Sequence, residues 1–169
     1  MCPASSSTWW SEVRASVLVV VLLLAGCGFQ LRGDVELSER LRTPYLEAPD
    51  RYSPFHAELT GALAGAGATL AARREEASAV VIIHRDDTGR NVLTISARNT
   101  PQEYEVYYTV EYSVAAGGRE ILPRQQLTLT RDYAYDDTEV LAKQHEERDI
   151  REALARDLAA LVTRRLAAL

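Results

Sequence analysis

Few side chains in this sequence have the types and spacing that catalysis requires. His56, His84 and His145 lie far apart, and none has a second histidine or a cysteine at metal-site spacing. The sequence motifs of serine hydrolases, zinc peptidases and phosphate-binding loops do not occur. Adjacent carboxylates, Asp86-Asp87 and Asp136-Asp137, are more typical of turns and helix caps than of acid-base pairs. The sequence therefore predicts a protein that is not an enzyme.

Cys27 is the residue whose surroundings do predict chemistry. It ends the stretch Leu24-Ala25-Gly26-Cys27, which closes the uncharged apolar segment Ala15 to Ala25 behind Arg14. A basic residue, a short apolar core and small residues form the layout of a secretory signal. The last four residues resemble the bacterial lipobox, in which the signal is cut before the cysteine. In this class of protein the cysteine first receives a diacylglycerol on sulfur, the signal is then removed, and the new amine receives an acyl chain, such as palmitate. The alternative is an unmodified cysteine in an ordinary signal.

The apolar core is too short to span a membrane permanently. It runs uninterrupted only from Val17 to Ala25, whereas a spanning helix needs roughly 20 residues. Several acyl chains, at about 0.8 kcal/mol per buried methylene, would instead hold the mature chain on a bilayer. We therefore expect residues 1–26 to be a removed signal peptide, Cys27 to carry a covalent lipid, and no other cofactor. Gly28 follows the cysteine where Asp would retain an enteric lipoprotein in the inner membrane, which favours the inner leaflet of the outer membrane, on the periplasmic side.

Composition limits the remaining possibilities. The chain has 169 residues, 47% of them hydrophobic and 25% charged, which suits one globular domain. Its net charge of -5 gives no basic surface for nucleic acid. We expect residues 27–43 to be a lipidated N-terminus and linker, and residues 44–169 to be a single folded domain.

The first half of that domain contains a strand, a helix and a second strand. Prolines enclose a short strand at 44–49, which suits only an edge or the beginning of a sheet. Ser53-Pro54 predicts a helix start, and the helix ends near Gly65. Residues 79–84 are mostly β-branched and predict a buried strand. We expect residues 86–89 to form a turn or bulge before the chain continues extended over 91–97.

The second half predicts a hairpin followed by a long helix. From Tyr104 to Val114, tyrosines and valines alternate with mostly polar residues, which predicts a strand with one buried face. Two glycines at 117–118 suit a tight turn into a partner strand over about 120–135, with Pro123 favouring an edge position. From 137 or 138 onward the apolar spacing becomes helical and predicts a long helix with i,i+4 pairs from Glu147 to Arg151 and from Glu152 to Arg156. Its apolar stripe consists of Val140, Leu141, Ile150, Leu154, Leu158, Leu161, Val162, Leu166 and Leu169. The predicted fold is α+β, a β-α-β-β-β-α two-layer sandwich in which two helices cover one face of a small mixed sheet of about four strands.

Several stretches, in this order and at this spacing, resemble the family of LPS-assembly lipoproteins called LptE. A lipidated cysteine opens the mature chain and is followed by a glycine, an aromatic residue and a Leu-Arg step. The matching segments are Cys27 to Arg32, Ser53 to Leu70, Arg98 to Tyr104, Gly118 to Pro123 and Leu141 to Lys143 with the acidic stretch after it. No one of them is diagnostic alone.

The resemblance implies a non-enzymatic role in the Gram-negative envelope. It implies a lipoprotein that plugs the LptD β-barrel of the outer membrane, helps that barrel to assemble and helps to insert lipopolysaccharide into the outer leaflet. Matched to the family pattern, Arg98 and Lys143 are the candidate contacts for lipopolysaccharide phosphates. The alternative for each is an ordinary surface charge. The alternative function is a periplasm-facing lipoprotein adaptor of another lipid-trafficking complex; a lipoprotein hydrolase is remote because no nucleophile constellation is present.

Overall fold

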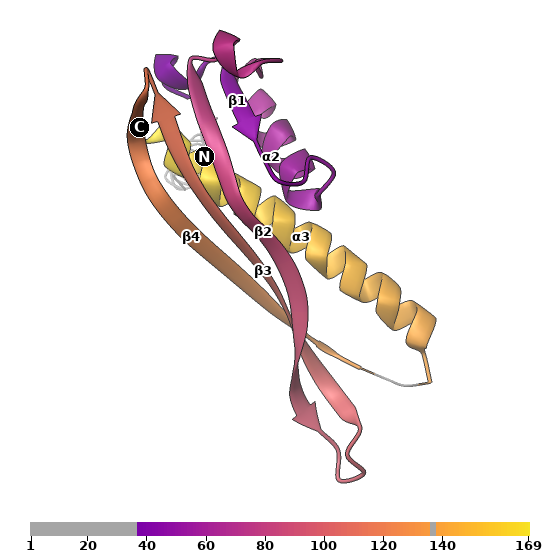
Figure 1. Cartoon of the computed structure of the whole chain (residues 1–169). Coiled ribbons are helices and arrows are strands. Elements are labelled where there is room, and N and C mark those ends of the chain that lie inside the picture. The colour runs from indigo at the N-terminus through magenta and orange to yellow at the C-terminus, as the bar shows by residue number, and fades with distance from the viewer. Residues whose placement is uncertain (1–36, 136–137) are drawn as a thin grey trace, which may run out of the picture. The chain divides into compact units, whose positions relative to one another are not determined.

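The computed structural model describes residues 37–135 and 138–169. They form a four-stranded mixed sheet in the order β1-β2-β3-β4, with two α-helices, α2 and α3, on one face (Figure 1). This confirms the predicted α+β sandwich. Residues Val35–Leu169 form one compact unit. The hydrophobic core is drawn from all four strands and both helices of this unit, and from Leu41 in the short helix η1 (Glu39–Leu41). The unit therefore has a complete core of its own, and Leu41 joins that core from within the segment we interpreted as a linker.

The first strand and helix follow the local sequence signals closely. Strand β1 (Pro44–Glu47) is an edge strand that pairs in parallel with β2. Helix α2 (Pro54–Gly65) begins after Ser53, whose hydroxyl accepts a hydrogen bond from the backbone N–H of His56 at 3.1 Å. This is a standard N-cap, and proline suits the first helical position because it has no N–H to satisfy. A second short helix, η2 (Arg74–Glu76), precedes β2.

Strand β2 (Ala79–Ile95) is longer than the sequence indicated. The turn or bulge expected at residues 86–89 is wrong, because this stretch continues the strand. The nearest irregularity in the pairing lies before it, between Ile83 and Arg85. Asp86 lies in this strand opposite Val110, and its carboxylate accepts a hydrogen bond from the hydroxyl of Ser53. Continuous pairing with β3 and this contact with the N-terminus of α2 override the local turn preference of the Asp-Asp-Thr-Gly stretch.

The central hairpin confirms the alternating pattern. Strand β3 (Pro101–Ala116) buries Val106, Tyr108, Val110, Tyr112 and Val114 on its helix-covered face. Gly117 and Gly118 have φ values of 56° and 74°, which glycine adopts without strain, and they turn the chain into β4 (Arg119–Ala134). Strand β4 is the other edge of the sheet, as its proline indicated.

Helix α3 (Val140–Ala167) has 28 residues and crosses the sheet diagonally (Figure 1). The predicted apolar stripe is confirmed at Ile150, Leu154, Leu158, Val162 and Leu166. It is wrong at Leu161, which is 36% exposed, and at its start, where Val140 and Leu141 are 42% and 74% exposed. Helix α2 packs against the later turns of α3, and the first turns extend beyond it (Figure 1). The stripe therefore meets no apolar partner there.

Candidate functional site

The sheet face opposite the helices is open in the part of the chain that the structure describes (Figure 1). This face carries a network of polar side chains. The hydroxyls of Thr109 and Thr128 lie 2.9 Å apart across strands β3 and β4. Arg124 forms an ion pair with Glu111 at 3.2 Å. Cross-strand hydroxyl and charge pairs of this kind stabilise a sheet face without an apolar cover. The face can form hydrogen bonds with a partner while remaining stable in water.

His84 is part of this polar network. An Arg124 guanidinium N–H donates to Nδ1 of His84 at 3.0 Å, so Nδ1 accepts and Nε2 carries the ring proton. The Nε2–H group donates a hydrogen bond to the hydroxyl oxygen of Ser113 at 2.8 Å. The histidine therefore has hydrogen-bond partners at both nitrogens and acts as a structural residue.

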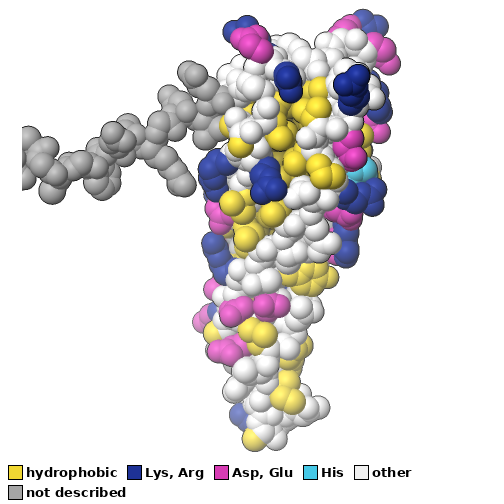
Figure 2. Space-filling model, turned by 90° about the vertical axis from the view of Figure 1, so that its left-hand side faces the viewer, with side chains coloured by type: hydrophobic (Ala, Val, Ile, Leu, Met, Phe, Trp, Pro, Cys, Tyr) yellow, Lys and Arg dark blue, Asp and Glu magenta, His cyan; other side chains and the backbone are white. Residues whose placement is uncertain are grey.

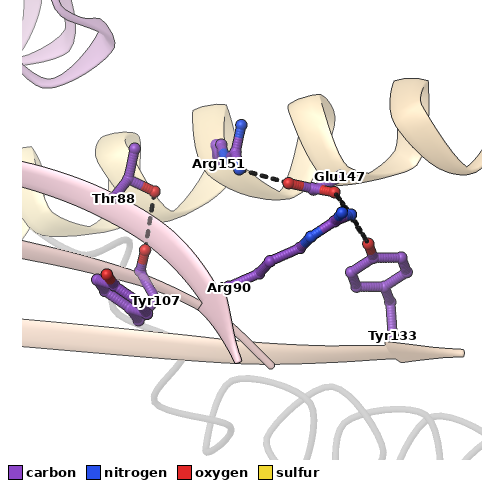
Figure 3. Close-up of polar contacts among 6 residues, drawn as sticks. All are labelled: Thr88, Arg90, Tyr107, Tyr133, Glu147 and Arg151. Carbon is purple, nitrogen blue, oxygen red and sulfur yellow. Dashed lines mark hydrogen bonds and ion pairs between the residues drawn. The ribbon is translucent and has the colours of Figure 1, made fainter. Parts of the chain in front are cut away.

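Tyr107 lies at the middle of the open face because the opposite residue is glycine. Gly89 pairs with Tyr107 in the register of β2 and β3. A Cβ atom at Gly89 would lie 2.5 Å from the Tyr107 hydroxyl oxygen, closer than any tolerated contact, so the tyrosine ring lies across the glycine. The Thr88 hydroxyl donates to the backbone carbonyl of Tyr107 at 2.8 Å (Figure 3). This close packing fixes a large amphipathic side chain on the open face.

Arg98 lies in the loop that joins β2 to β3. Ser96 shapes this loop: its backbone N–H donates to the carbonyl of Thr100 at 2.8 Å, and its hydroxyl accepts from the N–H of Arg98 at 3.2 Å. Asn99 adopts a positive φ of 62°, which asparagine tolerates in tight loops. Arg98 is exposed, and no described residue pairs with its guanidinium. Its charge is therefore available to an external anion.

Lys143 lies in the first turn of α3. Its side chain is only 18% exposed, and its Nζ lies 2.8 Å from a carboxylate oxygen of Glu146. A lipopolysaccharide phosphate would have to compete with this carboxylate or displace it. Arg98 and Lys143 lie toward the same end of the sheet, because the loop 96–100 closes the hairpin where β4 ends and α3 begins (Figure 1).

The same end of the sheet also exposes apolar side chains that sequence reasoning did not identify as a group. Val92, Leu93 and Ile95 on β2 are about half exposed, and Val140 and Leu141 are exposed at the start of α3. Two cationic positions thus share one end of the sheet with five apolar side chains. The Val-Leu-Thr-Ile stretch between polar segments was the available signal. An amphipathic end of this kind suits contact with an amphipathic ligand or protein.

A buried polar cluster holds the first half of α3 against the sheet (Figure 3). Glu147 of α3 accepts hydrogen bonds from Arg90 of β2 at 2.6 Å and from the hydroxyl of Tyr133 of β4 at 3.0 Å. Arg151, one turn further along α3, also pairs with this carboxylate. The Arg90 guanidinium carbon lies 4.5 Å from the centre of the Tyr104 ring, a cation-π distance. The cluster thereby fixes the position of the helix start that carries Lys143.

Two pKa values reflect this cluster. Burial raises the pKa of Tyr133 above its ordinary value, so the phenol stays protonated and can donate to the carboxylate. The pKa of Arg90 is also raised, first by its hydrogen bond with Tyr133 and then by the charge of Glu147. The phenol of Tyr133 and the guanidinium of Arg90 therefore keep these protonation states across the physiological pH range.

The clusters described above consist of hydrogen bonds and ion pairs among described residues. No group of His, Cys, Asp or Glu side chains within residues 37–135 and 138–169 could hold a metal ion. In the same ranges, no helix is long and apolar enough to cross a bilayer. Cys27 lies outside the described residues. An α+β sandwich with an open polar sheet face and an amphipathic end has the surfaces of a binding protein.

Comparison with known families shows which protein family the chain belongs to. The family model for LptE, described as lipopolysaccharide-assembly, matches residues 41–166, and the chain therefore belongs to the LptE family. The predicted relationship and the non-enzymatic role are confirmed. The LPS-assembly lipoprotein LptE of Pectobacterium atrosepticum is 26% identical over 150 residues, which cover 88% of this chain and 80% of that protein. The protein of the same description from Yersinia enterocolitica is also 26% identical, over 88% of this chain and 72% of its own length.

Solved structures share the fold. Lipoprotein B from Nitrosomonas europaea superposes with a TM-score of 0.70 at 24% identity, covering 83% of this chain and 91% of that one. A minor lipoprotein from Acinetobacter baumannii gives a TM-score of 0.64 at 23% identity, covering 76% and 92%. At these identities the likeness supports the fold alone. Together with the family match, these structures place the chain in the lipopolysaccharide-assembly family LptE with the fold of known lipoproteins.

Proposed function

We propose that this chain is an outer-membrane lipoprotein that plugs an LptD-like β-barrel, helps that barrel to assemble and assists lipopolysaccharide insertion into the outer leaflet. Membership of the LptE family supports the lipopolysaccharide part of this proposal. The open polar face of the sheet is the observation that carries the plugging part. The interior of a large membrane barrel is polar, and a plug must form hydrogen bonds with it rather than bury a large apolar patch.

The chemistry of the open face suits such a lumen. In the free protein the hydroxyls of Thr109 and Thr128 form a hydrogen bond with each other, and Glu111 forms an ion pair with Arg124. The face therefore needs no partner to remain folded. Hydroxyl and guanidinium groups can also bond to a second protein without breaking the strand pairing beneath them. A partner whose inner wall carries complementary polar groups would therefore bind without a large desolvation cost.

The proposed contacts with lipopolysaccharide are Arg98 and Lys143. Phosphates pair strongly with guanidinium and ammonium groups, and these two cations lie toward one end of the sheet beside exposed apolar side chains. Such an end can contact phosphates and acyl chains together. Lys143 must exchange its contact with Glu146 for a phosphate. Among the described residues, no carboxylate forms an ion pair with Arg98, so a phosphate can approach it directly.

The proposed anchor is a lipid on Cys27, which would place the domain at the periplasmic side of the outer membrane. The test is Cys27→Ala with a separate cleavable signal. We expect this variant to leave the membrane fraction when the barrel partner is absent. Continued membrane association under that condition would contradict lipid anchoring.

Detergent extraction followed by identification of bound proteins tests the barrel partner. We expect a stable complex with an outer-membrane β-barrel protein. A matched pair of variants assigns the contact: Thr128→Arg adds bulk and charge to the open face, whereas Glu152→Arg makes a similar change on the exposed side of α3. Only the first should reduce recovery of the barrel. Recovery of a soluble or inner-membrane partner instead would favour the adaptor function.

A further inference from the structure

A groove of about 330 Å³ lies between the last turns of α3 and the first half of β4. This volume is within the range of small-ligand pockets. Its apolar wall consists of Leu127, Leu161 and Ala168, and its polar groups come from Tyr112, Gln125, Arg164 and Arg165. Figure 2 views the molecule from the β4 side and shows hydrophobic side chains lying between Lys or Arg side chains in the upper part of this face.

The floor of the groove holds a phenol without a hydrogen-bond partner. Tyr112 is only 1% exposed, and the structure shows no described residue hydrogen-bonded to its hydroxyl. Burial raises the pKa of Tyr112, while the nearby positive charge of Arg165 acts in the opposite direction. The hydroxyl is not one of the described buried polar atoms that lack a partner, so it keeps access to water at the groove that Tyr112 lines, and a ligand there can replace that water.

Two adjacent guanidinium groups lie at the same groove. Arg165 donates to the side-chain oxygen of Gln125 at 3.3 Å, and within residues 37–135 and 138–169 neither Arg164 nor Arg165 forms an ion pair. The C-terminal end of a helix carries partial negative charge, which cations near it offset. The two full positive charges of Arg164 and Arg165 exceed the partial negative charge at the end of α3. The polar end of the groove is therefore net positive and favours an anion.

We propose that this groove binds a single-chain amphiphile with a phosphate headgroup, such as a lysophospholipid. The phosphate accepts hydrogen bonds from Arg164, Arg165 and the Tyr112 hydroxyl, while the first part of the alkyl chain lies against Leu127 and Leu161. Guanidinium groups bind phosphate with two parallel hydrogen bonds, which a neutral or zwitterionic head would use less well. Methylene groups in the apolar part of the groove add favourable burial.

This site is independent of the proposed lipopolysaccharide contacts. Arg98 and Lys143 lie at the end of the sheet where α3 begins, and the groove lies where α3 ends, so a helix of 28 residues, about 42 Å, separates the two ends. Loss of binding at the groove would leave the proposed function unaffected, and failure of the proposed function would leave the groove unaffected.

Calorimetric titration of the compact unit from residue 35 tests the proposal. The probe is dodecyl phosphate below its micelle concentration, compared with dodecyl maltoside, which has the same chain and a neutral head, and with inorganic phosphate. We expect dodecyl phosphate to bind at least tenfold more tightly than either comparison ligand. Tyr112→Phe removes only the hydroxyl and should weaken binding about three- to tenfold.

Charge variants locate the site on the helix. Arg164→Glu should weaken dodecyl phosphate binding more than tenfold, whereas Arg148→Glu, an equal change in the first half of α3, should have less than a twofold effect. The proposal would be overturned if dodecyl maltoside bound as tightly as dodecyl phosphate, or if the two charge variants had equal effects. It would also be overturned if the Tyr112→Phe variant bound dodecyl phosphate as tightly as the unmodified protein. Circular dichroism confirms that each variant is folded before its affinity is interpreted.

Discussion

Removal of the Glu147 carboxylate is the sharpest test of how α3 is held on the sheet. The side chain of Glu147 is 9% exposed and contacts Arg90, Tyr133 and Arg151. Glu147→Ala leaves the hydroxyl of Tyr133, a residue only 5% exposed, without its acceptor. An unsatisfied buried donor costs about 1 to 3 kcal/mol. The partly exposed guanidinium groups of Arg90 and Arg151 can be rehydrated, so each lost ion pair adds only about 0 to 1 kcal/mol.

We therefore expect Glu147→Ala to lower the free energy of unfolding by about 2 to 4 kcal/mol. For a domain of this size that corresponds to a fall in Tm of about 10 °C. Urea and thermal unfolding followed by circular dichroism measure both values. Glu147→Gln should cost less, because its amide oxygen can still accept from Tyr133 even though the charge is lost.

Asp157→Ala is the matched control for this experiment. Asp157 also joins α3 to the sheet, through Arg131 at 3.5 Å, but both side chains are about half exposed. The expected loss is below about 1 kcal/mol. Equal destabilisation by Glu147→Ala and Asp157→Ala would refute the argument that burial of the cluster, and not the number of ion pairs, holds the helix.

Three further predictions follow from particular residues. Val110→Asp places an unpaired charge in the core and should cost several kcal/mol, whereas Tyr107→Asp on the open face should cost much less; equal losses of thermal stability would show that the faces are misassigned. Burial, and after it the charge of Arg51, lowers the pKa of His56 in the folded protein. The free energy of unfolding is therefore unaffected by His56 above about pH 6.5 and decreases as the pH falls below that value, because the unfolded chain then binds a proton more readily than the folded one. Thermal unfolding between pH 7 and pH 5 should therefore be less pH-dependent for His56→Gln; an unchanged slope would contradict this. Arg98→Asp combined with Lys143→Asp should weaken binding of purified lipopolysaccharide more than tenfold, most clearly at low salt, and tight binding by the folded double variant would remove both residues from the site.

Local sequence signals were sufficient for most of the fold. The alternation from Tyr104 to Val114 predicted which face is buried, and the glycines at 117–118 predicted the hairpin. Residues 86–89 misled the sequence interpretation, because turn-forming residues remain in a strand when long-range pairing and packing favour it. The preference of a short segment cannot report contacts made with residues far along the chain.

The clusters were harder to predict than the elements. The sequence indicated Glu147 and Arg151 as a simple pair one helical turn apart, and that pair is confirmed. Arg156, which was expected to pair with Glu152, instead pairs with Glu58 of α2. Arg90 and Tyr133 join them from positions 57 and 14 residues away from Glu147, and no local periodicity links these positions. The groove at Tyr112 likewise depends on where the end of α3 crosses the sheet. Such sites arise from packing geometry, which one sequence does not reveal.

Site-specific photo-crosslinking in the intact envelope tests the central claim most directly. A photoreactive amino acid at position 128 probes the open polar face, and the same amino acid at position 152 probes the exposed side of α3. Our account predicts that position 128 forms an adduct with an outer-membrane β-barrel protein and that position 152 does not. Adducts with that barrel only from position 152, or adducts from position 128 only with a soluble periplasmic protein, would contradict the account.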